Sequence, residues 1–226
     1  MLEAPFLEFR PAGFAWFDGL ERDNSKAWFD AHRDIFEAEV KGPLTRLLDE
    51  IGAELGGAVK IFRQNRDVRF SKDKSPYKTN TYGVVSGVGG GSDGLYVSIS
   101  SRGVTAGTGY YDMAKDQLER FRIALVEPDS GAAFAARHSA AIATGLEDRA
   151  NALKTAPRGF PKDHPRIQYL RMKQVLLMQT LDRSEAQGRV PLEHALSVWH
   201  RAQPVMAWMG EHVGESTVPP EARFRR

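Results

Sequence analysis

The 226-residue sequence contains no cysteine. Its absence excludes disulfide bonds, thiolate-bound zinc, cysteine-held iron–sulfur clusters and catalysis by a cysteine nucleophile. Long apolar runs are also missing, because stretches such as 123–126 and 175–178 are far shorter than the roughly 20 residues that a membrane helix needs. The N-terminal residues lack the basic and apolar regions of a secretory signal. We therefore expect a cytoplasmic protein with no membrane partner.

Several short segments match known functional motifs in sequence, but the secondary structure expected around them differs from what each motif requires. Residues 89–94 fit G-x-G-x-x-G, yet a strand-like segment follows them where a dinucleotide-binding motif would open a helix. Ser71 and Lys74 fit S-x-x-K, but Pro76 disfavours the helix that this motif opens in acylating enzymes. The six histidines form no H-E-x-x-H pair, and we interpret His32, on an apolar stripe, as a core residue. No cofactor or metal site is predicted, although a metal site assembled across the fold stays open.

Apolar periodicity predicts an α+β fold, with an antiparallel meander sheet covered by N-terminal and C-terminal helices. Spacings of three and four residues predict helices at 14–22, 26–40, 43–55, about 118–127, 130–143, 166–179 and from 191 onward. Alternation predicts strands at 58–63, 77–88, 95–100 and 104–108, with a flexible hairpin loop at 87–94. No linker is evident, so we expect one domain over residues 5–212 and a mobile tail over 213–226.

Positive charge is concentrated in two segments, although the net charge of the chain is only +2. Residues 60–80 carry seven basic and two acidic side chains, and residues 158–173 carry five basic and one acidic. The rest of the chain is therefore acidic. This pattern favours a local anion site over a general nucleic-acid surface, which makes a whole domain basic.

Arg66 would lie on the more apolar face if 59–70 formed one strand. A buried guanidinium without a partner costs several kcal/mol, so it would need a carboxylate or a bound anion. Salt bridges from Asp67 and Asp73 to neighbouring basic residues are the structural alternative. Asp67, flanked by arginines, would have a lowered pKa, which suits an orienting group better than a general acid.

Phe62 and Arg63, together with the run from Arg66 to Thr79 (RDVRFSKDKSPYKT), resemble the signature of a family named domain of unknown function 2461. Other blocks also resemble this family, namely 19–20 (GL), 24–29 (NSKAWF), 32–33 (HR), 153–160 (LKTAPRGF), 163–165 (DHP) and 170–173 (LRMK). The resemblance spans about residues 6–210. It implies a shared fold unit and brings no activity, substrate or catalytic residue with it.

The family-like blocks are also the basic ones, so we expect the two segments to converge on a pocket. Trp28 is a further candidate for stacking on a ligand ring. The predicted ligand-binding residues are Arg63, Arg66, Asp67, Arg69, Lys72, Lys74, Tyr77, Lys78, Arg158, Arg171 and Lys173. Catalytic residues and oligomeric state are not predicted.

Three functions are consistent with these residues. The first is a pocket protein, or an enzyme, that binds a phosphorylated or other anionic small molecule. The second is a nucleic-acid binding module, with Tyr77, Tyr82 and Tyr96 as stacking platforms. The third is a structural or interaction protein whose arginines form buried ion pairs.

Overall fold

The computed structural model describes residues 5–69, 71–88 and 94–218. The chain divides into two compact units, and three elements contribute residues to both. Unit 1 comprises residues 1–86, 95–106 and 180–197, and unit 2 comprises residues 87–94, 107–179 and 198–226. The prediction of a single domain stays a prediction.

Six strands form one open antiparallel sheet with the order β1-β2-β3-β4-β6-β5, so the α+β prediction is confirmed. The first four strands follow one another as a meander. They are β1 (Ala58–Ile61), β2 (Asn80–Ser86), β3 (Leu95–Ser100) and β4 (Gly103–Tyr110). The last two are β5 (Glu147–Asp148) and β6 (Val175–Asp182). The expected loop residues 89–93 lie outside the described residues.

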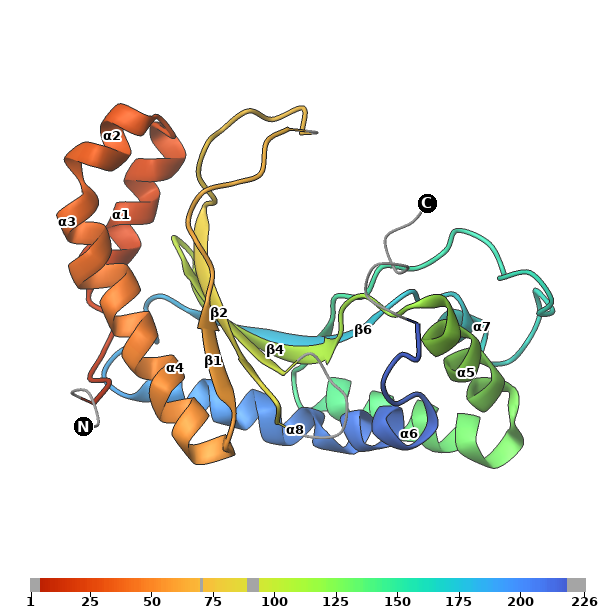
Figure 1. The fold of residues 1–226 in the computed structure, drawn as a ribbon. Helices are drawn as coiled ribbons and strands as arrows, with labels where there is room; N and C mark the ends of the chain where they lie inside the picture. Colours follow the sequence, from red (N-terminus) through yellow and green to blue (C-terminus); the bar gives the residue numbers. More distant parts are fainter. Residues whose placement is uncertain (1–4, 70, 89–93, 219–226) are drawn as a thin grey trace. The chain divides into compact units, whose positions relative to one another are not determined.

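The N-terminal helices of unit 1 precede its strands (Figure 1). They are α1 (Pro11–Arg22), α2 (Lys26–Ala31), α3 (Arg33–Ile35), the π-helical turn η1 (Phe36–Lys41) and α4 (Gly42–Leu55). The predicted helix over 26–40 is therefore three short segments. Ser25 caps α2 by accepting a hydrogen bond of 3.1 Å from the main-chain N–H of Trp28, as its residue type predicts. Gly56, at φ 73°, ends α4 in the left-handed conformation that glycine tolerates.

Helix α4 packs on one face of β1 and β2. Leu44, Leu47, Leu48 and Ile51 of its apolar stripe are completely buried, and each stabilises the fold by about 1.5–3 kcal/mol through its burial. A Cβ atom at Gly83 of β2 would lie 2.4 Å from Cδ1 of Leu48. The glycine therefore allows the helix to approach the strand closely.

Unit 2 contains α5 (Lys115–Val126), α6 (Pro128–Ala143), α7 (Ile167–Leu170) and the second half of α8 (Val190–His212). Phe121, Phe134 and Trp208 are fully buried and pack against one another. The predicted helix at 166–179 is wrong, because only α7 is helical there and β6 follows. A short apolar run such as 175–178 fits a buried strand as well as a helix, and periodicity alone does not separate them.

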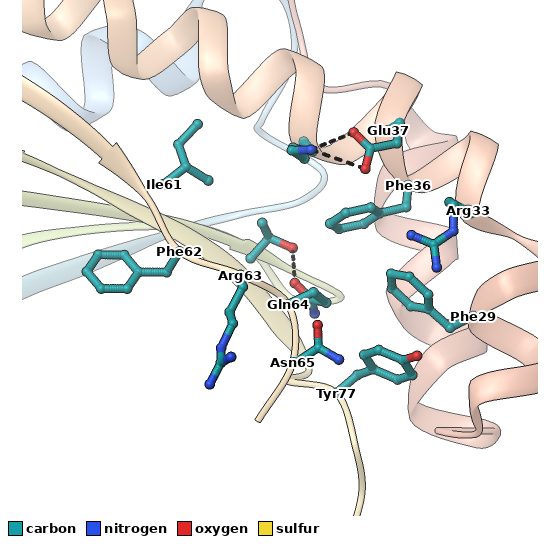
Figure 2. A pocket seen from close by; sticks show the side chains of 12 residues that line it. Phe29, Arg33, Phe36, Glu37, Ile61, Phe62, Arg63, Gln64, Asn65 and Tyr77 are labelled. Atoms are coloured by element: carbon teal, nitrogen blue, oxygen red, sulfur yellow. Dashed lines mark hydrogen bonds and ion pairs between the residues drawn. The ribbon is translucent and has the colours of Figure 1, made fainter. Parts of the chain in front are cut away.

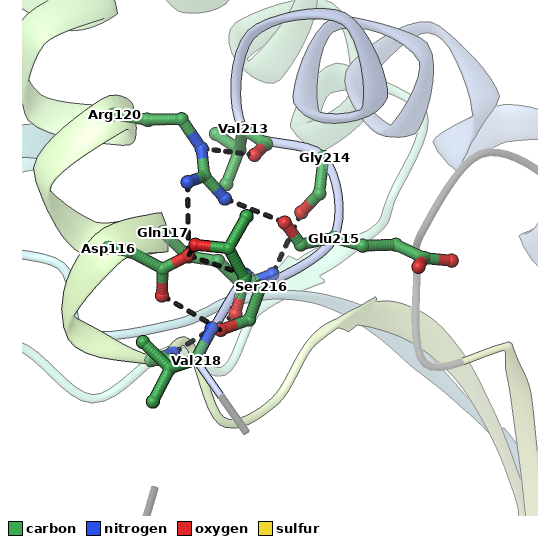
Figure 3. A network of polar contacts seen from close by, with 10 residues as sticks. Asp116, Gln117, Arg120, Val213, Gly214, Glu215, Ser216 and Val218 are labelled. Atoms are coloured by element: carbon green, nitrogen blue, oxygen red, sulfur yellow. Dashed lines mark hydrogen bonds and ion pairs between the residues drawn. The ribbon is translucent and has the colours of Figure 1, made fainter. Parts of the chain in front are cut away.

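The segment after α8 is hydrogen bonded to α5 as far as Thr217 (Figure 3). Asp116 accepts hydrogen bonds from the Ser216 hydroxyl at 2.8 Å and the Thr217 N–H at 2.9 Å. Arg120 donates to the main-chain carbonyls of Val213 and Glu215. The described part of the predicted tail, 213–218, therefore contacts α5, and residues 219–226 lie outside the described residues. No helix in the described part of the chain is long and apolar enough to span a membrane.

Candidate functional site

The basic segment of unit 1 forms the connection between β1 and β2. Strand β1 ends at Ile61 and β2 begins at Asn80, so the predicted strands 58–63 and 77–88 are too long and the 59–70 strand is wrong. A single β-bridge joins Asn65 to Tyr77 within the connection. Residues 63–69 are mostly polar or charged, so they bury little apolar surface in the sheet. This explains why the pairing of β1 with β2 stops early.

The base of the connection is held by buried polar contacts. The Gln64 side chain, 6% exposed, donates to the carbonyl of Lys78 and accepts from the Thr81 hydroxyl at 2.7 Å. The main-chain N–H of Lys78 donates in return to the carbonyl of Gln64 at 3.0 Å. These bonds fix the backbone on which Arg63 and Lys78 are carried.

Two ion pairs occupy the outer part of the connection. Arg66 pairs with Asp73, and Arg69 pairs with Asp67 at 2.7 Å. The Arg66 side chain is 27% exposed and its Asp73 partner is exposed, so Arg66 is not a buried guanidinium without a partner. Asp67 and Asp73 form the salt bridges that the structural alternative expected. The remaining lysines, Lys72 and Lys74, are exposed, and Lys74 donates to the Val68 carbonyl at 3.0 Å.

The two carboxylates stay ionised at neutral pH. Hydrogen bonds from the Arg69 side chain and main chain lower the pKa of Asp67 to about 2, as expected. Hydrogen bonds from Ser75, and then from Arg66, hold the pKa of Asp73 well below its usual range. Neither is suited to act as a general acid.

A pocket of about 400 Å³ lies between the start of this connection and the helices α2, α3 and η1 (Figure 2). Its aromatic wall includes Phe29 and the buried Tyr77, whose rings stack with centroids 4.1 Å apart. Because this stack uses one face of Tyr77 and the residue is 5% exposed, Tyr77 serves mainly as a wall of the pocket. Its predicted ligand-binding role stays a prediction.

The cations of the helix wall already have carboxylate partners. Arg33 pairs with Asp30 at 2.7 Å and lies over the ring of Phe29, and Lys41 pairs with Glu37 at 2.8 Å. Arg63 differs, because its guanidinium has no ion-pair or hydrogen-bond partner within the described residues. In Figure 2 its side chain extends from the strand-side rim, away from the helices.

Lys78 lies beside Arg63 at this rim. Its ammonium donates a hydrogen bond to the main-chain carbonyl of Arg63 and lies 5.1 Å from the centroid of the Tyr82 ring. Burial lowers the pKa of the Lys78 ammonium, and the positive charge of Arg63 lowers it further. Two neighbouring cations without a paired carboxylate among the described residues attract an anion.

A row of half-buried rings crosses the strand-side face next to this rim. Phe62 and Tyr82 stack with centroids 4.7 Å apart, and Tyr82 and Tyr96 follow at 5.3 Å. Tyr82 therefore has an aromatic ring on either side, which leaves less of its own ring face open for stacking on a nucleobase. The nucleic-acid alternative stays a prediction.

The second basic segment belongs to unit 2, and two of its arginines donate hydrogen bonds to main-chain carbonyls. Arg166 donates to the carbonyls of Leu125, Val126 and Glu127 at the end of α5. Arg171 donates to the carbonyl of Leu153 at 2.6 Å. Arg158 and Lys173 are exposed. The convergence of the two segments stays a prediction.

Sequence reasoning missed two features. His138 of α6 pairs with Asp148 of β5 at 2.9 Å, although ten residues separate them and no short motif joins them. Trp28, predicted to stack on a ligand ring, stacks on His32 with centroids 4.1 Å apart. His32 is half-buried and donates from Nδ1 to the Trp28 carbonyl at 2.8 Å, so its polar group is satisfied. No group of three or more potential metal-ligating side chains occurs in residues 5–69, 71–88 and 94–218.

Comparison with known proteins identifies a family and no activity. A family model described as "Conserved hypothetical protein (DUF2461)" matches residues 12–208. No curated protein matches the chain. Because the match covers most of the sequence, including both basic segments, the protein belongs to the DUF2461 family.

Proposed function

We propose that the protein binds a phosphorylated or other anionic small molecule, with the anion held by Arg63 and Lys78 at the rim of the unit 1 pocket. The observation that carries the proposal concerns Arg63, whose guanidinium has no partner within the described residues and whose main-chain carbonyl accepts from the Lys78 ammonium. The nearby cations of the connection and helix wall, Arg66, Arg69, Arg33 and Lys41, each have a carboxylate partner.

The chemistry of the two cations suits an oxyanion. A guanidinium offers two parallel N–H donors that match phosphate or carboxylate, and a lysine adds a compact charge. The base of the connection is fixed by Gln64 and Thr81, so little ordering of the backbone is needed on binding. The adjacent pocket of about 400 Å³ is large enough for the rest of a small metabolite.

The test is thermal unfolding with pyrophosphate, ribose 5-phosphate and a short single-stranded oligonucleotide at low ionic strength. A ligand at a hundredfold its dissociation constant adds about 2.7 kcal/mol, which is roughly 5–10 °C for a chain of this length. The critical variant is Arg63→Gln. The Arg63 guanidinium makes no hydrogen bond or ion pair within the described residues, so its loss should leave the fold intact.

Lys72→Gln is the matched control, because it removes one charge from the same connection at an exposed position. We expect Arg63→Gln to abolish the stabilisation by the small anions and Lys72→Gln to retain it. Equal losses in both variants would indicate a diffuse charge effect instead. A response to the oligonucleotide alone, lost in salt, would favour the nucleic-acid function.

A further inference from the structure

Unit 2 contains an imidazole that is oriented by a carboxylate. Nε2 of His138 lies 2.9 Å from Oδ2 of Asp148, and the other oxygen of Asp148 accepts from the main-chain N–H of Ala150 at 2.9 Å. A carboxylate accepts hydrogen bonds, so Nε2 of His138 carries the hydrogen. The neutral imidazole therefore has its lone pair on Nδ1.

Nδ1 of His138 has no hydrogen-bond partner within the described residues. The residue is 7% exposed and lines a hollow. The hydroxyl of Tyr169, a residue that is 5% exposed, likewise has no hydrogen-bond partner within the described residues.

A hollow of about 360 Å³ lies at these groups. His138, Asp148 and Tyr169 line it, with the His138 and Tyr169 rings 5.2 Å apart. Ile142 and Met172 supply apolar surface to the same hollow. The lining thus combines the His138 acceptor and the Tyr169 hydroxyl with two apolar side chains, and the exposed side chains of Ser139 and Gln168 complete it.

We propose that this hollow is a second ligand site, in which Nδ1 of His138 accepts a hydrogen bond from the hydroxyl group of an uncharged, partly apolar small molecule. Asp148 acts as a positioning residue, because it fixes the tautomer that leaves Nδ1 free to accept. An uncharged ligand fits because the one carboxylate of the lining already accepts from His138 and Ala150. This site is independent of the anion site of unit 1.

A purely structural His138–Asp148 pair makes a different prediction for chemical reactivity. Diethyl pyrocarbonate acylates a neutral imidazole nitrogen, forming an N–C bond while the C–O bond of the anhydride breaks and ethyl carbonate leaves. If the pair is only structural, reactivity follows exposure, and His138 reacts far more slowly than the exposed His200 of α8. If Nδ1 is an oriented acceptor open to the hollow, His138 reacts at a rate within about threefold of His200.

The rates are measured for each histidine by peptide mass spectrometry on the full chain. We expect Asp148→Asn to slow His138 by about tenfold, because an amide can donate to Nε2 and move the hydrogen to Nδ1. Glu147→Gln, the exposed neighbour, is the control and leaves the rate unchanged. Thermal unfolding of each variant verifies that it is folded. A His138 rate more than tenfold below that of His200, or no effect of Asp148→Asn in a folded variant, overturns the site.

The ligand class is tested with benzyl alcohol and benzyl methyl ether at the same millimolar concentration. The alcohol can donate to Nδ1 and the ether cannot. We expect the alcohol to slow acylation of His138 and not of His200, and the ether to leave both rates unchanged. Equal protection by the two compounds, or protection by neither, overturns the assignment of a hydroxyl-bearing ligand.

Discussion

The side-chain amide of Asn24 pairs with both main-chain groups of Tyr77. Its Oδ1 accepts from the Tyr77 N–H at 3.0 Å, and its Nδ2 donates to the Tyr77 carbonyl at 3.1 Å. The amide thus acts as a one-residue strand partner that joins the turn between α1 and α2 to the basic connection. Across the connection, Asn65 forms the β-bridge to the same residue.

Replacing Asn24 by Asp should destabilise unit 1. The carboxylate can still accept from the Tyr77 N–H, but it cannot donate to the carbonyl, and its charge faces that carbonyl oxygen. We expect a loss of about 1–2 kcal/mol, or roughly 3–6 °C in melting temperature. Lys26→Ala, two residues along and exposed, is the control and should shift the melting temperature little. A stability equal to wild type for Asn24→Asp would show that the paired bonds contribute nothing net.

The sequence predicted helices and strands correctly where apolar residues recur with one clear periodicity. The stripe of α4 and the alternation of β3 are examples, since β3 runs from Leu95 to Ser100 as expected. Prediction failed at β6, because its apolar run carries no alternation and its partners, β4 and β5, come from distant parts of the sequence. Pairing partners of this kind are tertiary information, which propensity does not contain.

The sequence predicted which region holds the candidate site, but not how its side chains are arranged. Charge density located the connection, and the segment that it singled out includes Arg63 and Lys78. It could not separate Arg63, which lacks a partner within the described chain, from Arg66, which pairs with Asp73. That distinction depends on where the loop turns, and the sequence does not specify the turn.

Arg66→Ala should fold and keep nearly wild-type stability. The Asp73 partner is exposed, and its carboxylate also accepts from the N–H and the hydroxyl of Ser75. Surface ion pairs of this kind contribute little to the free energy of unfolding. In the variant, the exposed Asp73 carboxylate keeps water and Ser75 as partners. Circular dichroism and thermal unfolding test the point. Loss of the folded state would instead support a structural role for the basic connection.

Replacement by valine should affect the free energy of unfolding differently at two threonines of β4. The Thr108 hydroxyl, in unit 2, is fully buried and lacks a hydrogen-bond partner among the described residues, whereas the Thr105 hydroxyl, in unit 1, bonds that of Thr180 at 2.9 Å. Thr108→Val keeps the shape and removes an unsatisfied polar atom, so we expect no loss or a gain of about 1 kcal/mol. Thr105→Val removes one partner of a pair and should cost about 1 kcal/mol. Urea unfolding of both variants measures the difference, and a destabilised Thr108→Val would reveal a partner such as buried water.

Asp116 should anchor residues 213–218 in a pH-dependent way (Figure 3). Burial alone would raise the pKa of its carboxyl group, but hydrogen bonds from the Thr217 N–H, the Ser216 hydroxyl and Arg120 lower that pKa well below its usual range. A lowered folded-state pKa means that the carboxylate contributes its full stability above the unfolded-state pKa of about 3.9. The contribution is lost as the pH falls through the folded-state pKa.

Asp116→Asn tests this anchor. We expect the variant to lose about 1–3 kcal/mol at pH 7, because the amide keeps one acceptor oxygen and loses the charge-assisted bonds. The difference from wild type should begin to shrink below about pH 4, and hydrogen exchange at Thr217 should accelerate in the variant at neutral pH. Glu119→Gln, exposed on the same helix, is the control for removing one charge from α5. An Asp116→Asn deficit of the same size at pH 7 and pH 3 would contradict the anchoring by the ionised carboxylate, since the deficit would then not depend on the ionisation of Asp116.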